Sequence, residues 1–340
     1  MTAPLDQPAS SHLRPRHRAV VVANPVARRA VPLHAIRVAA ALALPGWDVE
    51  VVETARGGDA ARLASIATRA EVDAVVACGG DGTLNGVING VASALDGRHS
   101  GPAIGLIPAG TANVWAKEAR IPRDPEHALS LLESGVRVPL DLGIATLRGE
   151  SRRFLLMCGV GLDAAVVGRV ESRPRLKRRL GPLAFVGQGV ATLARWQPVY
   201  ASVEVDGEVR TQPLALAIAG NTRLYGGVAR VVAAARADDG LLDLVTFEAA
   251  EGRRGALLHG RQALAALAGR LDRMGVRGAA YRRGAAIGVR PERALAVQVD
   301  GEWLGECGPE APLTLGVEPR ALTFALPAVP SPLFSLPAVP

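Results

Sequence analysis

The stretch Ala74-Val-Val-Ala-Cys-Gly-Gly-Asp-Gly-Thr-Leu-Asn85 decides the fold, because it joins an apolar run directly to a glycine-rich turn. The run 74–77 has the composition of a buried strand, and the pattern over Leu84–Leu95 is helical. Three glycines within Gly79–Gly82 let the backbone turn sharply and approach a ligand, and the following helix presents unpaired N–H groups to an anion. The stretch therefore predicts a strand, a phosphate-binding turn and a helix in succession.

An alternative interpretation is a plain strand-to-helix turn in which Asp81 or Thr83 caps the helix. The stretch is not a Walker A loop, because no Gly-Lys-Ser/Thr follows, and it lacks the spacing of the dinucleotide fingerprint. Two further loops, Asn24-Pro25 and Pro108-Ala-Gly-Thr-Ala-Asn113, also follow apolar runs. A doubly wound sheet brings the carboxyl ends of its strands to one edge, so the three loops together favour a nucleotide-phosphate site.

Apolar runs alternate with helical patterns throughout the first third of the chain. The strand-like runs are 19–23, 48–54, 74–77 and 103–107, and the helical patterns lie near 33–44, 59–70 and 84–95. This alternation predicts a doubly wound α/β nucleotide-binding domain over residues 18–138. From 139 to 317 the pattern changes to short strands separated by turns, with helices expected near 180–196 and 253–274, which predicts a mainly antiparallel β domain.

The ends of the chain differ in composition from the rest. Residues 1–17 are polar and contain prolines, and the motif Leu-Pro-Ala-Val-Pro occurs at 326–330 and again at 336–340. We therefore predict tails over 1–17 and 327–340, and we expect the apolar run 321–326 to return with 318–320 to the first domain. The length of 340 residues agrees with two domains.

Composition excludes several classes of protein. With 49% hydrophobic and 21% charged residues the chain is a folded protein, and its net charge of +7 favours an anionic partner. Three widely separated cysteines indicate neither a disulfide framework nor a zinc site. No signal peptide and no run of 18 uncharged apolar residues is present, so we expect a cytoplasmic protein that meets a membrane only from its surface.

The ordered set of motifs resembles the diacylglycerol kinase catalytic family, which includes sphingosine and ceramide kinases and the soluble bacterial lipid kinases. The resemblance covers about Arg18 to Leu326 and adds motifs in the second half of the chain to the three loops above. These motifs are Gly159-Val-Gly-Leu-Asp-Ala164, Asn221 with Tyr225-Gly-Gly227, Asp239-Gly240 and Asp300-Gly-Glu302. The resemblance implies ATP-dependent phosphorylation of a lipid hydroxyl, in a cleft between an NAD-kinase-like α/β domain and a β-sandwich domain.

The same resemblance implies two groups of binding residues. ATP is expected against Asn24, Pro25, Thr54, Gly79, Gly80, Asp81, Gly82, Thr83, Leu84, Asn85, Gly110, Thr111 and Asn113. A structural Mg²⁺ is expected on the Asp239 carboxylate and the main-chain carbonyls of Arg236 and Leu241. Carboxylate and carbonyl oxygens suit a hard cation, although the residues alone would be interpreted as a hairpin turn.

Two copies of Val-Asp-Gly-Glu, at 205–208 and 299–302, compete for the catalytic role. Both predict a strand, an Asp-Gly hairpin turn and a second strand, so spacing cannot choose between them. The resemblance assigns the second copy, with Glu302 as the base for the lipid hydroxyl and Asp300 as its partner in phosphate and metal handling. For Asp81 three roles stay open: binding Mg²⁺, assisting proton removal or orienting the loop.

The segment Arg169–Arg179 is strongly basic, and an apolar stretch over Leu180–Trp196 follows it. This arrangement predicts peripheral association with an anionic membrane, with a solvated helix flank as the alternative. No nucleic-acid motif is present, so nucleic acid is not expected as a partner. The acceptor lipid stays open, as does a homodimer. An NAD kinase-like enzyme and a non-catalytic lipid or nucleotide-binding protein on the same fold are the competing functions.

Overall fold

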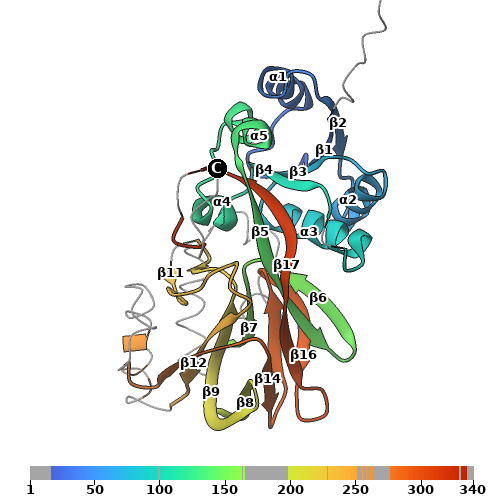
Figure 1. The fold of residues 1–340 in the computed structure, drawn as a ribbon. Helices are drawn as coiled ribbons and strands as arrows, with labels where there is room; N and C mark the ends of the chain where they lie inside the picture. Colours follow the sequence, from blue (N-terminus) through green and yellow to red (C-terminus); the bar gives the residue numbers. More distant parts are fainter. Residues whose placement is uncertain are drawn as a thin grey trace, which may run out of the picture.

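A computed structural model describes residues 17–98, 100–162, 164, 198–227, 229–250, 255, 258, 261–262, 276–328 and 331–334 (Figure 1). Several predictions concern segments outside these residues. These segments are residues 1–16 of the expected N-terminal tail, the basic segment 169–179, the apolar stretch 180–196, most of the helix expected over 253–274, and the repeat at 336–340.

The first unit is a parallel sheet covered by helices on both faces (Figure 1). Its strands are β1 (Arg18–Ala23), β2 (Asp48–Glu53), β3 (Ala74–Gly79) and β4 (Ala103–Pro108), in the order β4-β3-β1-β2. Helices α1 (Leu33–Ala43) and α5 (Pro125–Ser134) pack together, as do α2 (Asp59–Arg69) and α3 (Asp81–Leu95). The direction of winding reverses between β1 and β3, the position at which doubly wound sheets bind ligands.

Burial explains why these segments form strands. Strands β3 and β4 are buried along their whole length, which matches their continuous apolar sequences. Strand β2 at the edge of the sheet alternates between exposed and partly buried positions. The short helix α4 (Val114–Glu118) follows the loop after β4, and Trp115 at its start is fully buried against Phe324.

The second unit is a β structure, and it completes the predicted α/β plus β fold. Its main strands are β6 (Glu150–Phe154), β7 (Met157–Gly161), β8 (Val199–Val205), β9 (Glu208–Gly220), β12 (Leu242–Glu248), β13 (Ala279–Gly284), β14 (Ile287–Pro291), β15 (Leu295–Val299) and β16 (Glu302–Cys307). Their pairings with one another are antiparallel. A separate two-stranded ribbon joins β10 (Leu224–Tyr225) to β11 (Ala229–Arg230).

Two long strands, β5 (Val136–Leu147) and β17 (Leu313–Leu326), connect the units (Figure 1). They pair antiparallel, with a register shift between Glu318 and Leu322. The first part of β17 pairs with β14, and near its end Phe324 pairs parallel with Ile104 of β4. The boundary expected at 138/139 therefore falls inside a continuous strand, and one core cluster extends from the first unit into the second.

Part of the segment expected to be a C-terminal tail is packed. The Leu333 side chain is fully buried, and the Phe334 ring contacts Trp115 edge-on at 6.4 Å between ring centroids. This segment packs because two of its side chains are apolar: Leu333 belongs to the core that α4 also contacts, and Phe334 packs against that core. All three cysteines are buried, and none of them forms a disulfide. In the part of the chain that the structure describes, no helix has the length and apolarity to cross a membrane.

Candidate active site

The loops that follow β1, β2, β3 and β4 lie side by side at one edge of the sheet. Backbone hydrogen bonds continue past the strand ends: Thr54 N–H donates to Ala23 O at 2.9 Å, and Asn24 N–H donates to Cys78 O at 2.9 Å. On the other side Ala109 N–H donates to Gly79 O at 2.8 Å. The structure thus brings together the three loops that the sequence singles out, with Thr54 beside them.

Two glycines let the loops after β3 and β4 touch through their backbones. A Cβ added to Gly80 would lie 3.1 Å from Gly110 Cα, and one added to Gly110 would overlap Gly80 Cα and lie 2.7 Å from Asn113 Oδ1. Helix α3 begins directly after Gly80, and no side chain caps it. The N–H groups of its first turn are therefore left for an anion.

Side chains fix the shape of these loops. Asn24 Nδ2 donates to Thr83 Oγ1 at 3.2 Å, and Asn24 Oδ1 accepts from Val26 N–H at 3.1 Å. Asn113 has a left-handed φ of 47° and closes its own loop, because its amide exchanges hydrogen bonds with Gly110 N–H and Gly110 O at 2.9 and 3.1 Å. Thr111 is exposed and Leu84 lies in the core, so only the first of these two side chains is open to a ligand.

Asp81 links the glycine-rich loop to α4. Its Oδ1 accepts from Trp115 N–H at 3.2 Å, so the carboxylate supplies the cap that α4 lacks from its own Asn113. Burial raises the pKa of the Asp81 carboxyl, while the N–H groups of Val114 and Trp115 and the nearby Lys117 oppose that shift. The Asp81 carboxylate therefore ties the start of α3 to the start of α4, and the three roles considered for it stay predictions.

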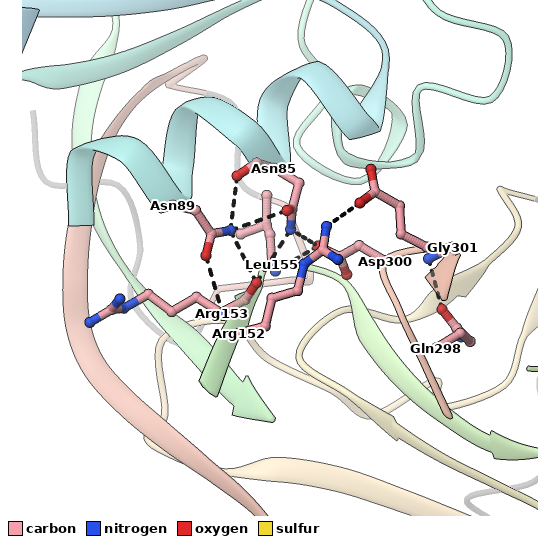
Figure 2. Close-up of polar contacts among 9 residues, drawn as sticks. Asn85, Asn89, Arg152, Arg153, Leu155, Gln298, Asp300 and Gly301 are labelled. Atoms are coloured by element: carbon pink, nitrogen blue, oxygen red, sulfur yellow. Dashed lines mark hydrogen bonds and ion pairs between the residues drawn. The ribbon is translucent and has the colours of Figure 1, made fainter. Parts of the chain in front are cut away.

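The Asp300 carboxylate receives four hydrogen bonds from two units of the protein. Figure 2 shows two of the donors, Asn85 and Leu155. Its Oδ1 accepts from the N–H groups of Leu156 and Met157 at 2.9 Å each. Its Oδ2 accepts from Leu155 N–H at 2.9 Å and from Asn85 Nδ2 at 2.7 Å. Burial raises the pKa of Asp300 to about 6, and these four donors oppose the shift. All the acceptor positions of this carboxylate are used to hold the β6–β7 turn and α3.

A second asparagine, one helical turn further along α3, extends this connection (Figure 2). Asn89 Nδ2 donates to Asn85 Oδ1 at 3.1 Å and to Arg153 O at 3.2 Å, and Asn89 Oδ1 accepts from Arg153 N–H at 3.3 Å. Sequence reasoning missed Asn89, although the spacing of four between two asparagines on one helix was a usable signal.

Glu302 lies at the first turn of α3. A Cβ added to Gly82 would lie 3.4 Å from Glu302 Oε1, so this oxygen faces the glycine-rich loop. The other oxygen, Oε2, forms an ion pair with Arg152 of β6, whose side chain points into the same region (Figure 2). Arg152 was also missed, since a lone arginine in an arginine-rich chain carries no distinguishing signal.

The competing copy, 205–208, forms the same kind of hairpin in a different place. Asp206 and Asp300 both have left-handed φ values, 48° and 50°, and both carboxylates accept backbone N–H groups from a neighbouring loop. Glu208, however, pairs with Arg210 two residues along its own strand, and both side chains are more than half exposed. Only the second copy places its glutamate beside α3.

The expected metal-binding turn contains a dense group of carboxylates. The Asp239 carboxylate forms an ion pair with Arg283, which also lies 3.3 Å from Asp243. Asp141 Oδ2 accepts from Gly240 N–H at 2.6 Å, and burial raises the pKa values of Asp141 and Asp243. Within the described ranges, no three His, Cys, Asp or Glu side chains are grouped as metal ligands.

Comparison with known proteins assigns a family model to each half of the chain. Residues 18–145 match the diacylglycerol kinase catalytic domain, and residues 157–326 match the YegS C-terminal NAD kinase beta sandwich-like domain. The chain is 32% identical to a diacylglycerol kinase of Bacillus subtilis over 68% of its own length and 74% of the relative's. It is 33% identical to a probable YegS-like lipid kinase of Stenotrophomonas maltophilia over 76% and 81% of the two lengths.

A crystal structure of a diacylglycerol kinase from Bacillus anthracis has the same fold, with a TM-score of 0.64, 20% identity, and coverage of 92% of this chain and 97% of that one. The fold, the glycine-rich loop and the acidic turn define a two-domain kinase. The chain belongs to the diacylglycerol kinase catalytic family of lipid kinases, and its second half carries the YegS-type C-terminal domain. It is thus an ATP-using lipid kinase, and the two competing functions are set aside.

Proposed function

We propose that the enzyme transfers the γ-phosphoryl group of ATP to the free hydroxyl of a diacylglycerol, with Glu302 as the general base. The acceptor is proposed because the relatives in Bacillus subtilis and Staphylococcus carnosus are named diacylglycerol kinases. The observation that carries the residue assignment is the position of Glu302 Oε1 against Gly82, at the start of α3. A carboxylate from the second unit thus meets the loop expected to hold the phosphates.

The proposed step is a single displacement at the γ-phosphorus. The lipid hydroxyl oxygen bonds to that phosphorus, the bond to the bridging oxygen breaks, and its electron pair leaves with ADP. The hydroxyl proton passes to Glu302 Oε1, because an alcohol has to lose its proton as the new bond forms. Arg152 holds Oε2 on the opposite side and so leaves Oε1 directed at the loop.

The nucleotide phosphates are proposed to lie on the first turn of α3 and against Gly80 and Gly110. These glycines leave the backbone N–H groups unobstructed, and the positive end of the α3 dipole adds to the attraction. Asn24 with Thr83, and exposed Thr111, border this position from the two neighbouring loops. The proposed nucleotide contacts are otherwise those of Pro25, Thr54, Gly79, Gly82, Asn85 and Asn113.

Asp300 is proposed as a residue that positions the acidic turn. Its four hydrogen bonds leave no free acceptor position for a phosphate-bound metal, so the role in metal handling implied by the family resemblance is not the one its contacts favour. The Asp300 carboxylate instead fixes the turn from which Glu302 extends. Gln298 supports the same turn by accepting from Gly301 N–H at 2.7 Å.

A structural Mg²⁺ is proposed at the turn around Asp239. The buried and unpartnered Asp243 Oδ2, together with the neighbouring Asp141 and Asp239, provides the hard oxygen chemistry that this cation prefers. Asp239 would hold it with the carbonyls of Arg236 and Leu241 after release from Arg283. The Mg²⁺ that accompanies ATP would supply positive charge at the phosphates.

Peripheral binding to an anionic membrane is proposed from the basic segment 169–179 and the net charge of +7. Sedimentation with vesicles should increase with the fraction of anionic lipid and decrease with salt. Sedimentation that ignores both would contradict this part of the proposal.

A lipid-panel kinase assay tests the central proposal. The enzyme is incubated with ATP and separately with diacylglycerol, phosphatidylglycerol and a sphingoid base, and the extracted products are identified by mass. We expect phosphatidic acid from diacylglycerol as the main product. Phosphorylation of another lipid alone would overturn the acceptor, and no phosphorylation of any lipid would overturn the function.

A further inference from the structure

Glu118, the last residue of α4, is a buried carboxylate outside the active-site contacts described above. Its side chain is 1% exposed, and it forms an ion pair with Arg223, which is 13% exposed. Glu118 Oε2 accepts from Arg223 Nη2 at 2.6 Å and from Nε at 3.1 Å. Glu118 Oε1 accepts from the N–H groups of Arg223 and Leu224 at 2.9 and 2.6 Å. One carboxylate thus holds both the side chain and the backbone of a segment of the second unit.

The segment that Glu118 holds, 223–227, lies against the loop 108–113, which we call the nucleotide loop. Lys117 Nζ donates to Gly227 O at 3.3 Å, so two successive side chains of α4 form hydrogen bonds with the segment 223–227. A Cβ added to Gly227 would lie 3.6 Å from Val114 Cγ2 and 3.7 Å from Ala112 O. The backbone at Gly227 therefore lies beside the end of the loop 108–113.

The C-terminal segment 331–334 supports the same contact from behind. Ser331 Oγ donates to Glu118 O at 2.8 Å, and Leu333 O accepts from Ala237 N–H at 3.0 Å. These bonds connect α4 with the turn that leads to Asp239. Both matched domain models end by residue 326, so this support lies beyond them.

We propose that Glu118 is a positioning residue that fixes the placement of segment 223–227 of the second unit against the nucleotide loop. The inference rests on the proposed function, because it assigns Glu118 a part in aligning acceptor and nucleotide. Asp81 anchors the first turn of α4 independently of Glu118. Loss of the Glu118 contacts with Arg223 and Leu224 therefore affects the alignment of the acceptor far more than the binding of nucleotide.

The test compares Glu118→Gln with Glu318→Gln. Glu318 forms a similar bidentate ion pair with Arg153, with hydrogen bonds of 2.5 and 2.8 Å, but does not contact 223–227. We expect Glu118→Gln to lower kcat at least about tenfold and to raise the KM for lipid, because small misplacements of reacting groups are costly. The Kd of a non-hydrolysable ATP analogue should change less than about threefold, since Asp81 still holds the loop. Glu318→Gln should lower the melting temperature without changing kcat or either KM.

A neutral pair provides the rescue. In Glu118→Gln/Arg223→Gln the amides can bond to one another and no unpaired charge stays buried, so kcat should recover toward the wild-type value. If Glu118→Gln does not fold, Arg223→Lys replaces it, because lysine keeps the charge but cannot form the bidentate pair. This variant should also have a lower kcat with little change in ATP-analogue affinity.

Kinetic constants of Glu118→Gln or Arg223→Lys equal to those of Glu318→Gln would overturn the inference while leaving the lipid kinase assignment intact. If the wild-type enzyme phosphorylates no lipid, the proposed function fails first. The ATP-analogue affinity and hydrogen exchange of 223–227 then still report whether Glu118 holds this segment.

Discussion

The side-chain amide of Asn85 donates a 2.7 Å hydrogen bond to the carboxylate of Asp300, and so ties α3 to the turn that carries Glu302. The bond joins the glycine-rich loop of the first unit to the acidic turn of the second. Because the same carboxylate also holds Leu155 and Leu156, the two halves of the candidate site are fixed relative to each other before any ligand binds.

Glu302→Gln should lower kcat by about 10²- to 10⁴-fold, the usual contribution of a general base, while the ATP-analogue Kd and the free energy of unfolding stay near wild type. The reason is that Glu302 is partly exposed and its loss leaves the Asp300 network intact. The matched control is Glu208→Gln in the second Val-Asp-Gly-Glu copy, which should retain full activity. Comparable losses in both variants would refute the assignment.

Asp300 should titrate near pH 6, which nuclear magnetic resonance of its carboxyl carbon can measure. Its pKa is higher in the folded than in the unfolded protein, so the folded state takes up a proton as the pH falls through 6. Asp300 thereby adds to stability below its unfolded pKa of 3.8 and loses that contribution as the pH rises through about 6. The difference is on the order of 3 kcal/mol from about two pKa units.

Activity should follow the opposite trend. Protonation removes acceptor capacity from the carboxylate that holds the acidic turn, so kcat should fall as the pH drops below about 6. In Asp300→Asn this acid limb should disappear and kcat should be low at every pH. Urea unfolding of the wild type and this variant at pH 5 and pH 7.5 supplies the stability comparison. An Asp300 pKa near 4 would contradict both expectations.

Gly110→Ala should destabilise the protein by about 1–3 kcal/mol and abolish most nucleotide affinity, because the added methyl group forces the two glycine-rich loops apart. Gly316→Ala in β17 is the control, because no atom outside residues 315–317 lies within 4 Å of the added Cβ. Chemical unfolding and titration with a fluorescent ATP analogue measure the two effects. Unchanged ATP affinity in Gly110→Ala would show that the close approach of Gly80 and Gly110 is irrelevant to the nucleotide.

Asp81 caps α4, and Mg²⁺ binding or assistance in proton removal stays open for the same carboxylate. Two substitutions separate the structural role from these two. Asp81→Ala should lose the α4 cap, about 0.5–2 kcal/mol of unfolding free energy, together with activity. Asp81→Asn keeps an oxygen for Trp115 N–H, so stability should stay near wild type while the loss of charge lowers kcat. Full activity in Asp81→Asn would leave loop orientation as the whole role.

The loops at the strand ends were predictable because their placement follows from local rules. A strand, a glycine-rich turn and a helix in succession fix where Gly80 lies, and parallel pairing fixes which loops are its neighbours. The choice between the two Asp-Gly turns was not predictable from spacing, since both form the same hairpin and both aspartates accept backbone N–H groups. Only the tertiary position of β16 distinguishes Glu302 from Glu208.

Contacts between segments that lie far apart in the chain could not be predicted from the sequence. Glu118 and Arg223 carry ordinary charges in a chain with 39 basic and 32 acidic residues, and nothing local marks them as a buried pair. The packing of Leu333 likewise depends on a core built from both units, whereas its sequence context is that of a proline-rich tail. Such features follow from how the sheets meet.

The pairing of Phe324 with Ile104 has a consequence for how the enzyme is made. Strand β4 receives its second neighbour only when β17, near the end of the chain, has left the ribosome. Until then the nascent nucleotide-binding half exposes a hydrophobic strand edge, which is a site for aggregation. A ribosome that stalls before residue 326 thus carries an unfinished first domain, because β17 completes a sheet whose other strands were made more than 200 residues earlier.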